Sequence, residues 1–229
     1  MTAAIIVFAK APRPGLVKTR MTPPLSPAEA AELYGCLLDD VLDTTAQIAR
    51  ALALDAVLAV HPLEACAELA RRAPTPFRVV AQMGPDLSQR REWAVAEAAA
   101  AGLGPVLLRG SDSPALEQAV VEAALGALRE SDVVISPDRD GGYNLIGLRR
   151  PAPGLFDHPM STPSALADTL ERARRLGLSS RLLPPGFDLD TVADLQWLAE
   201  AKAQGCVTCP RTLTFLDERA LWRHARRGF

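Results

Sequence analysis

The sequence predicts one α/β domain built on a mixed, mostly parallel sheet that helices cover on both faces. Short apolar runs of strand length alternate with helix-like segments through the first five strands, which is typical of such a sheet. Hydrophobic residues make up 48% of the 229 residues, enough for a sizeable core. No long linker divides the chain, so we expect a single domain over residues 1–229.

The first five strands are apolar runs expected at residues 3–9, 56–60, 77–81, 105–109 and 132–136. The helices between them are expected at residues 26–52, 63–72, 86–101 and 114–129. The first helix is the best marked of these. Its apolar residues Leu33, Leu37 and Val41 recur at helical spacing, and Ser26-Pro27 followed by Glu29 is typical of a helix start.

The pattern changes after Gly142. Residues 143–148 are expected to form a strand that a short turn joins to its predecessor, so this pair is antiparallel and the sheet is mixed. A helix at 162–176, a short strand at 180–183 and a helix at 191–203 follow. The segment 217–227 is amphipathic and basic.

The overall charge of the chain excludes some classes of partner. Lysine and arginine number 25 against 27 acidic residues, which leaves a net charge of −2 and no general attraction to nucleic acid or to an anionic membrane. Phosphate binding must therefore be local. The first strand has no basic leader-like region before it, and no apolar stretch has membrane-spanning length, so we expect a cytoplasmic protein.

The four cysteines are expected to be reduced thiols. Cys206 and Cys209 form a C-x-x-C pair, a spacing that could supply two of the four ligands of a zinc site. A structural zinc site needs four ligands, and no second pair has a suitable spacing. We therefore favour a packed or solvent-facing turn for this pair.

Acidic turns follow two of the predicted strands. Gly110-Ser111-Asp112-Ser113-Pro114 comes after the fourth strand, and Asp138 and Asp140 follow the fifth. In open α/β sheets, ligands bind outside the carboxyl ends of the strands. Carboxylates at two such ends are suited to hold a metal ion and its substrate, which points to an enzyme.

The loop after the first strand is basic. Lys10, Arg13, Lys18 and Arg20 lie within eleven residues, with Gly15 between them. Lys10, Lys18 and Arg20 are candidates to neutralise phosphate charge, and Gly15 would let the backbone approach a ligand. The loop has neither the P-loop order nor a G-x-G-x-x-G. A solvated basic loop is the alternative, but the carboxylates at other strand ends favour phosphate binding.

Four segments together carry a family resemblance. They are Lys10-x-Pro12-x-x-Gly15-x-x-Lys18-Thr19-Arg20, Gly110-Ser-Asp-Ser-Pro114, Asp140-Gly-Gly-Tyr143, and Asp188-Leu-Asp190-Thr191 followed by Asp194-Leu195. They resemble the radical-SAM/selenodomain-associated transferases, also described as arsenosugar-biosynthesis glycosyltransferases, which are similar to the GT-A nucleotide-diphospho-sugar transferases. The resemblance spans about residues 5–215. It implies a three-layer α/β/α sandwich of the GT-A, Rossmann-like type.

The resemblance also implies a divalent cation, Mg²⁺ or Mn²⁺, between a protein carboxylate and the diphosphate. Asp112 matches the second acid of the family's Asp-x-Asp site, and Ser111 stands where related enzymes often have another acid. We expect Asp112 and Asp190 as the metal ligands, and Asp188 and Asp140 are the next candidates for the second ligand after Asp190. The alternative for Asp190-Thr191 is a helix N-cap.

Asp112, Lys18 and Asp140 are the expected catalytic residues, with Asp140 orienting or deprotonating an acceptor hydroxyl. An ordinary hairpin turn is the alternative for Asp140-Gly-Gly. Base or ribose contacts are expected from Asp86 and Arg90. The expected substrate and nucleotide contacts are Ala9, Lys10, Gly15, Lys18, Arg20, Asp86, Arg90, Gly141, Gly142, Tyr143, Ser161 and Thr162.

These expectations favour a metal-dependent glycosyltransferase that takes a nucleotide-diphospho-sugar and a small-molecule acceptor. Metal and cationic side chains would stabilise the leaving nucleoside diphosphate. The alternative is a nucleotidyltransferase that transfers NMP from an NTP to a phosphorylated small molecule, because the Lys18-Thr19-Arg20 loop also resembles the guanylyltransferases that activate phospholactate. A nucleotide-binding module without turnover is a third class, against which the intact Asp112, Lys18 and Asp140 argue. Base, sugar, acceptor and oligomeric state stay open.

Overall fold

The computed structural model describes residues 2–225 and contains a seven-stranded sheet. The strand order is β3-β2-β1-β4-β6-β5-β7. The strands are β1 Ala4–Lys10, β2 Asp55–His61, β3 Arg78–Ala81, β4 Val106–Gly110, β5 Val133–Pro137, β6 Tyr143–Leu148 and β7 Ser180–Leu182. Strand β6 runs antiparallel to β4 and β5, and the other pairs are parallel. The predicted mixed, mostly parallel sheet is confirmed.

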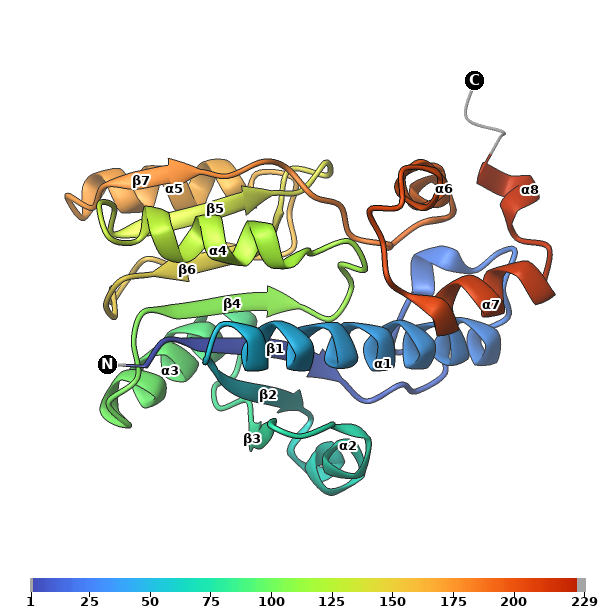
Figure 1. The fold of residues 1–229 in the computed structure, drawn as a ribbon, viewed down its shortest axis with the longest axis horizontal. Coiled ribbons are helices and arrows are strands. Elements are labelled where there is room, and N and C mark those ends of the chain that lie inside the picture. Colours follow the sequence, from blue (N-terminus) through green and yellow to red (C-terminus); the bar gives the residue numbers. More distant parts are fainter. Residues whose placement is uncertain (1, 226–229) are drawn as a thin grey trace.

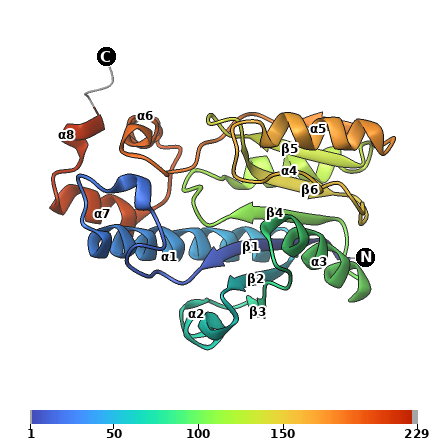
Figure 2. The same ribbon diagram turned by 180° about the vertical axis from the view of Figure 1, so that it is seen from behind.

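Helices cover both faces of the sheet. The helices of the described chain are α1 Pro27–Ala51, α2 Cys66–Arg72, α3 Leu87–Ala100, α4 Gln118–Ala127, α5 Ala165–Arg175, α6 Leu195–Ala203, α7 Pro210–Glu218 and α8 Trp222–Ala225, of which α6, α7 and α8 lie beyond the strand ends (Figure 1). In Figure 1, α1 and α4 lie in front of the strands. The view from behind in Figure 2 shows α3 and α5 on the opposite face. The arrangement is the expected three-layer α/β/α sandwich.

Several helix starts differ from the prediction. Helices α4 and α5 begin a few residues later than expected, at Gln118 and Ala165, because the chain first completes a turn. Before α5, the Ala165 N–H donates to the carbonyl of Thr162 at 3.1 Å. The expected helix at 191–203 begins as a 3-10 turn. Helix α7 begins at Pro210, well before the basic segment expected at 217–227, and residues 226–227 lie outside the described residues.

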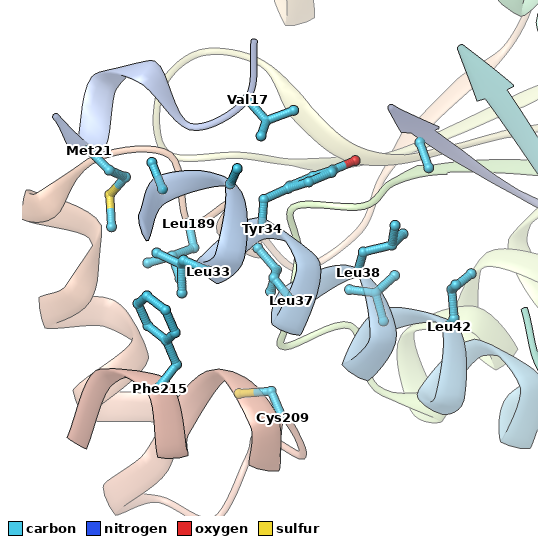
Figure 3. Close-up of a cluster of buried hydrophobic side chains, with 14 of the residues drawn as sticks. Val17, Met21, Leu33, Tyr34, Leu37, Leu38, Leu42, Leu189, Cys209 and Phe215 are labelled. Atoms are coloured by element: carbon cyan, nitrogen blue, oxygen red, sulfur yellow. The ribbon is translucent and has the colours of Figure 1, made fainter. Parts of the chain in front are cut away.

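Helix α1 anchors the largest core cluster. Ser26 and Glu29 form a reciprocal capping box at its start. Its buried residues pack on the sheet and on the helices beyond the strand ends. Figure 3 shows Leu33 and Leu37 of α1 together with Phe215 of α7 in this cluster. The buried carboxylate of Asp40 accepts a hydrogen bond from the Thr212 N–H of α7 at 2.8 Å, so α1 also caps the start of α7.

The cysteines are unpaired in the structure. Cys209 is fully buried beside α1, and burial raises the pKa of its thiol to about 12. A thiol with so high a pKa is a packing group and a poor metal ligand or nucleophile at neutral pH. Among residues 2–225, none of the helices combines the length and the apolar character that crossing a membrane requires.

The chain order places a topological switch point at the middle of the sheet. The chain builds outward from β1 to β2 and β3, and β4 then returns to the other side of β1. Ligands in such sheets bind outside the carboxyl ends of the strands at this crevice. In Figure 1 the arrowheads of β1 and β4 point to the same end of the sheet, toward α6 and α7.

Candidate active site

A cavity of about 500 Å³ opens at the carboxyl ends of the central strands. It is lined by the loops that follow β1, β3, β4, β5 and β6, together with Asp188 and Asp190. Most of the predicted site residues meet there: Ala9, Lys10, Lys18, Arg20, Arg90, Asp112, Asp140, Gly142, Tyr143, Ser161, Thr162 and Asp190. Gly15, Asp86 and Gly141 do not line the cavity.

An ion-paired cluster, which we call the charged centre, consists of Lys18, Asp112 and Asp190. The Lys18 ammonium donates to the carboxylate of Asp112 and to Oδ1 of Asp190 at 2.8 Å. Burial of Lys18 opposes its charge, but the two carboxylates outweigh burial and raise its pKa. Burial likewise opposes the charge of Asp190, but Lys18 lowers the pKa of this carboxyl. Lys18 and Asp190 therefore both carry charge at neutral pH.

The local backbone brings these three groups together. Lys18 adopts a left-handed conformation (φ 47°) at the start of a 3-10 turn. That conformation is uncommon for a residue with a Cβ. The neighbouring Val17 and Met21 are buried against the α1 cluster (Figure 3). On the other side, the Leu189 N–H donates to the Asp112 carbonyl at 2.9 Å, which fixes residues 188–190 beside the turn after β4.

The helix cap near Asp190 belongs to its neighbours. Thr191 and Asp194 form the capping box, with the Thr191 N–H donating to Asp194 Oδ2 at 2.6 Å. The Asp190 carboxylate is not the cap and faces Lys18 instead. The alternative that Asp190-Thr191 serves as a helix N-cap is thus correct for Thr191 only.

Two buried polar networks hold the turn after β4. The Arg109 guanidinium donates to Thr45 Oγ1 at 2.9 Å and to the Ser113 carbonyl at 2.7 Å. Burial lowers the pKa of Arg109 to about 10. The Tyr34 hydroxyl accepts from the Lys10 N–H at 3.0 Å and shares a hydrogen bond with Ser111 Oγ at 2.8 Å. These networks fix the loops after β1 and β4 relative to each other.

Two further carboxylates face the cavity beside the charged centre. Asp188 accepts a hydrogen bond from the Ser113 hydroxyl. Burial, together with the charges of Asp112 and Asp138, raises its pKa well above the usual range. The sequence analysis placed Asp138 in the acidic turn after the fifth strand but assigned it no individual role. Burial raises the pKa of Asp138 to about 6, and the nearby Asp140 acts in the same direction.

The turn between β5 and β6 is built as a hairpin turn. Asp140 Oδ1 accepts from the Gly142 N–H at 2.8 Å while its carboxylate also borders the cavity. Gly141 has φ +90°, and a Cβ there would lie 2.0 Å from the Pro163 carbonyl oxygen. Glycine is therefore required at 141 by backbone conformation and by space, a structural role in place of the expected ligand contact.

Of the two residues expected to contact the base or ribose, only one lines the cavity. The Asp86 carboxylate caps α3 by accepting from the Gln89 N–H at 2.8 Å, which takes it out of the cavity lining. Arg90 lines the cavity and is anchored by donating to the Gly84 carbonyl at 2.9 Å. Gly15, where a ligand contact was expected, lies in an open turn, and a Cβ added there would meet nothing within 4 Å.

Sequence reasoning missed Gln82 and Arg91, which line the cavity. Gln82 directly follows β3, so the strand-end rule that selected Asp112 would have found it. Its amide nitrogen donates to the carbonyls of Ala9 at 3.1 Å and Ala59 at 2.9 Å. Because only the nitrogen can face two carbonyl oxygens, the amide oxygen is left as the free acceptor. Arg91 lies inside α3 and had no such signal.

The charged centre has the donor chemistry for a divalent cation. Within residues 2–225, no group of three or more His, Cys, Asp or Glu side chains is arranged to hold a metal ion. Asp112 and Asp190 nevertheless converge on one positive charge, the Lys18 ammonium. Mg²⁺ commonly uses one or two carboxylates together with substrate phosphates and water. The residues therefore fit a cation that is held jointly with a phosphorylated substrate.

The chain is similar to proteins of known family and name. The family model described as "Uncharacterized protein conserved in bacteria (DUF2064)" matches residues 44–162. The phosphoenolpyruvate guanylyltransferase of Sphaerobacter thermophilus is 33% identical over 187 residues, which cover 80% of this chain and 86% of that protein. The 3-phospho-D-glycerate guanylyltransferase of Phenylobacterium zucineum is 35% identical over 183 residues, covering 77% and 81%.

A solved structure matches nearly the whole chain. It is a protein of Desulfovibrio desulfuricans G20 named as a candidate nucleotide-diphospho-sugar transferase, with 31% identity, a TM-score of 0.85, and coverage of 98% of this chain and 99% of that one. The GT-A-like fold expectation is confirmed. The guanylyltransferase relatives support the nucleotidyltransferase alternative better than the glycosyltransferase that we favoured from sequence. These matches do not support the radical-SAM and arsenosugar association.

Proposed function

The chain belongs to the DUF2064 family and is a transferase of the nucleotidyl or nucleotide-sugar type, and we propose that within this class it is a nucleotidyltransferase. The proposed reaction moves GMP from GTP to the phosphate group of a small phosphorylated acid. Its nucleotide and acceptor classes come from the guanylyltransferase relatives. The observation that carries the proposal is the charged centre, because it places a buried lysine and two carboxylates at the switch point where a triphosphate would lie.

In the proposed reaction, a phosphate oxygen of the acceptor attacks the α-phosphorus of GTP. A new P–O bond forms there, the bond from the α-phosphorus to the bridging oxygen breaks, and pyrophosphate leaves with that electron pair. Negative charge builds on the α-phosphoryl group and the leaving pyrophosphate. Lys18, Lys10 and Arg20 line the cavity where they can offset this charge. A Mg²⁺ or Mn²⁺ ion held by Asp112 and Asp190 would supply further charge neutralisation.

This reaction needs little from a general base, because an acceptor phosphate is already ionised at neutral pH. The site agrees with that requirement. Asp140, the base expected from sequence, is exposed and holds its own turn by accepting from the Gly142 N–H. Glycosyl transfer to a hydroxyl group would ask more of such a carboxylate. It is the second candidate, and the Desulfovibrio protein's name is the observation that favours it.

The test is a pyrophosphate-release assay with the purified protein, Mg²⁺ and GTP, using phosphoenolpyruvate or 3-phospho-D-glycerate as acceptor. We expect release to require both the acceptor and the metal. An inactive Asp112→Asn variant would tie turnover to the charged centre. Release of a nucleoside diphosphate from a sugar nucleotide, with no pyrophosphate from any NTP, would overturn the proposal in favour of glycosyl transfer.

A further inference from the structure

Arg91 extends from α3 to the side of the cavity formed by β6 and the chain before α5. Its Nη1 donates to the Tyr143 hydroxyl at 2.8 Å and approaches the Met160 sulfur at 3.4 Å. The guanidinium carbon lies 5.1 Å from the centre of the Tyr143 ring and 6.0 Å from that of Phe156. Two aromatic rings and one hydrogen bond therefore fix the orientation of the guanidinium group.

The opposite edge of this guanidinium group has no partner among residues 2–225. Arg91 Nε is buried and makes no hydrogen bond to any residue that the structure describes. Nη2, the terminal nitrogen on the same edge, likewise has no partner in that part of the chain, but it is not among the buried atoms. Arg91 lines the cavity. The terminal nitrogen Nη2 is therefore an unpaired and accessible donor beside the cavity, where a ligand can supply the acceptor.

The same edge of another arginine shows what would satisfy it. In Arg72, Nε donates to Asp39 Oδ1 at 2.9 Å and Nη2 donates to Asp39 Oδ2 at 2.8 Å. One carboxylate thus takes both nitrogens. Across the described chain, Arg72 is paired in this way, whereas Arg91 forms no ion pair. Its positive charge beside the cavity is uncompensated by those residues.

We propose that Arg91, through its accessible Nη2, binds the carboxylate of the acceptor. This inference rests on the proposed function and identifies the part of the acceptor that the enzyme recognises. The acceptor phosphate is the group that must reach the α-phosphorus beside the charged centre, so we assign the acceptor's other anionic group to Arg91. The acceptor's second anionic group then faces the β6 side of the cavity. A carboxylate oxygen can accept a charge-assisted hydrogen bond from Nη2.

The test compares two acceptors that differ in one group. 3-Phospho-D-glycerate carries a carboxylate where sn-glycerol 1-phosphate, which has the same arrangement at carbon 2, carries a hydroxymethyl group. We expect the wild-type protein to bind the phosphoglycerate, or phosphoenolpyruvate in its place, about 10 to 100 times more tightly than glycerol phosphate in calorimetric titrations with Mg²⁺. Arg91→Met should abolish this preference, while the KM for GTP changes less than about threefold.

Two further variants separate recognition from packing. Arg91→Lys keeps the charge but loses the planar guanidinium group that Tyr143 orients, so we expect it to recover only part of the preference. Arg174→Met is the matched control. The same edge of Arg174 is paired with Glu171 on the exposed side of α5, at 2.8 and 2.9 Å, and its loss should leave acceptor affinity unchanged.

The outcomes divide clearly. A preference for the carboxylate that persists in Arg91→Met, or an equal loss of affinity for GTP and acceptor, overturns the role of Arg91. Equal affinity of the wild type for the two acceptors does so as well. Failure of the wild type to release pyrophosphate from any NTP would overturn the nucleotidyltransferase proposal, while the calorimetric preference would still report on Arg91.

Discussion

The two sides of the cavity differ in whether their charged side chains have partners within the protein. At the charged centre, the Lys18 ammonium is paired with two carboxylates of the protein itself, those of Asp112 and Asp190. On the β6 side, by contrast, one edge of the Arg91 guanidinium group has no partner among residues 2–225.

This difference suggests a division of labour. The charged centre is organised before substrate binds, which is the condition under which fixed charges stabilise a transition state most effectively. The β6 side is incomplete, and an anionic ligand there would relieve an unmet donor. Reaction chemistry would then depend on the charged centre, and the choice of acceptor on the β6 side. The variants below test this division, from the largest expected effect to the smallest.

The largest effect is expected for Lys18→Met. The two carboxylates would lose their counter-charge, and the phosphates would lose a cation in the cavity. We expect kcat/KM to fall about 10²- to 10³-fold, the range for a lost charge-stabilising contact. Arg20→Met is the control, since Arg20 is 63% exposed and lies 3.8 Å from Asp190. It should lose less than about tenfold. Similar losses for both would contradict a special role for the buried lysine.

Next is Asp112→Asn, which keeps the shape of the side chain but removes its charge. Lys18 retains Asp190, so we expect little change in thermal stability. The Mg²⁺-dependent part of GTP affinity should fall about 10- to 100-fold in titrations with and without the metal. An Asn variant that unfolds, or that binds GTP and Mg²⁺ normally, would make the carboxylate structural.

An intermediate effect, on stability, is expected for Asp138→Asn. The ordinary pKa of an aspartate is 3.8, and that of Asp138 is about 6. Between these values the folded protein holds a proton that the unfolded chain has released. This contribution to stability is therefore complete below pH 3.8 and is lost as the pH rises through 6.

The Asn variant mimics the neutral side chain, so it should be more stable than the wild type at pH 8. Because Asp138 is partly exposed, solvent screens part of the effect of its charge. We therefore expect the free energy of unfolding to rise by about 1 kcal/mol, which corresponds to a Tm about 2–4 °C higher. The difference should vanish near pH 4. Thermal unfolding at both pH values checks this, and an equal Tm difference at the two would rule out titration of Asp138 as the cause.

Local sequence signals predicted the elements that depend on local structure. The apolar runs located the strands, and Ser26-Pro27 followed by Glu29 located the start of α1, where the structure shows a capping box between Ser26 and Glu29. The strand-end rule placed Lys10, Asp112 and Asp140 at one cavity. These features need only neighbouring residues and the handedness of the fold.

The features that the sequence did not reveal depend on contacts across the chain. Lys18 and Asp190 are separated by 172 positions, and nothing local indicates that they pair. The need for Gly141 arises from the Pro163 carbonyl in another segment. Arg91 resembles any charged residue of an amphipathic helix until its partners, Tyr143 and Phe156, are placed beside it.

The smallest effect separates the two candidate reactions. In Asp140→Asn the side-chain oxygen can still accept from the Gly142 N–H, so the hairpin should persist. If an ionised phosphate is the nucleophile, no base is required, and we expect kcat for pyrophosphate release to change less than about tenfold. A base for an acceptor hydroxyl would instead contribute about 10²- to 10⁴-fold. Measuring kcat with GTP and phosphoenolpyruvate, alongside the KM for each substrate, decides between them. A fall in kcat of about a hundredfold with unchanged KM would instead show that Asp140 acts as a base, and it would weaken the case for nucleotidyl transfer.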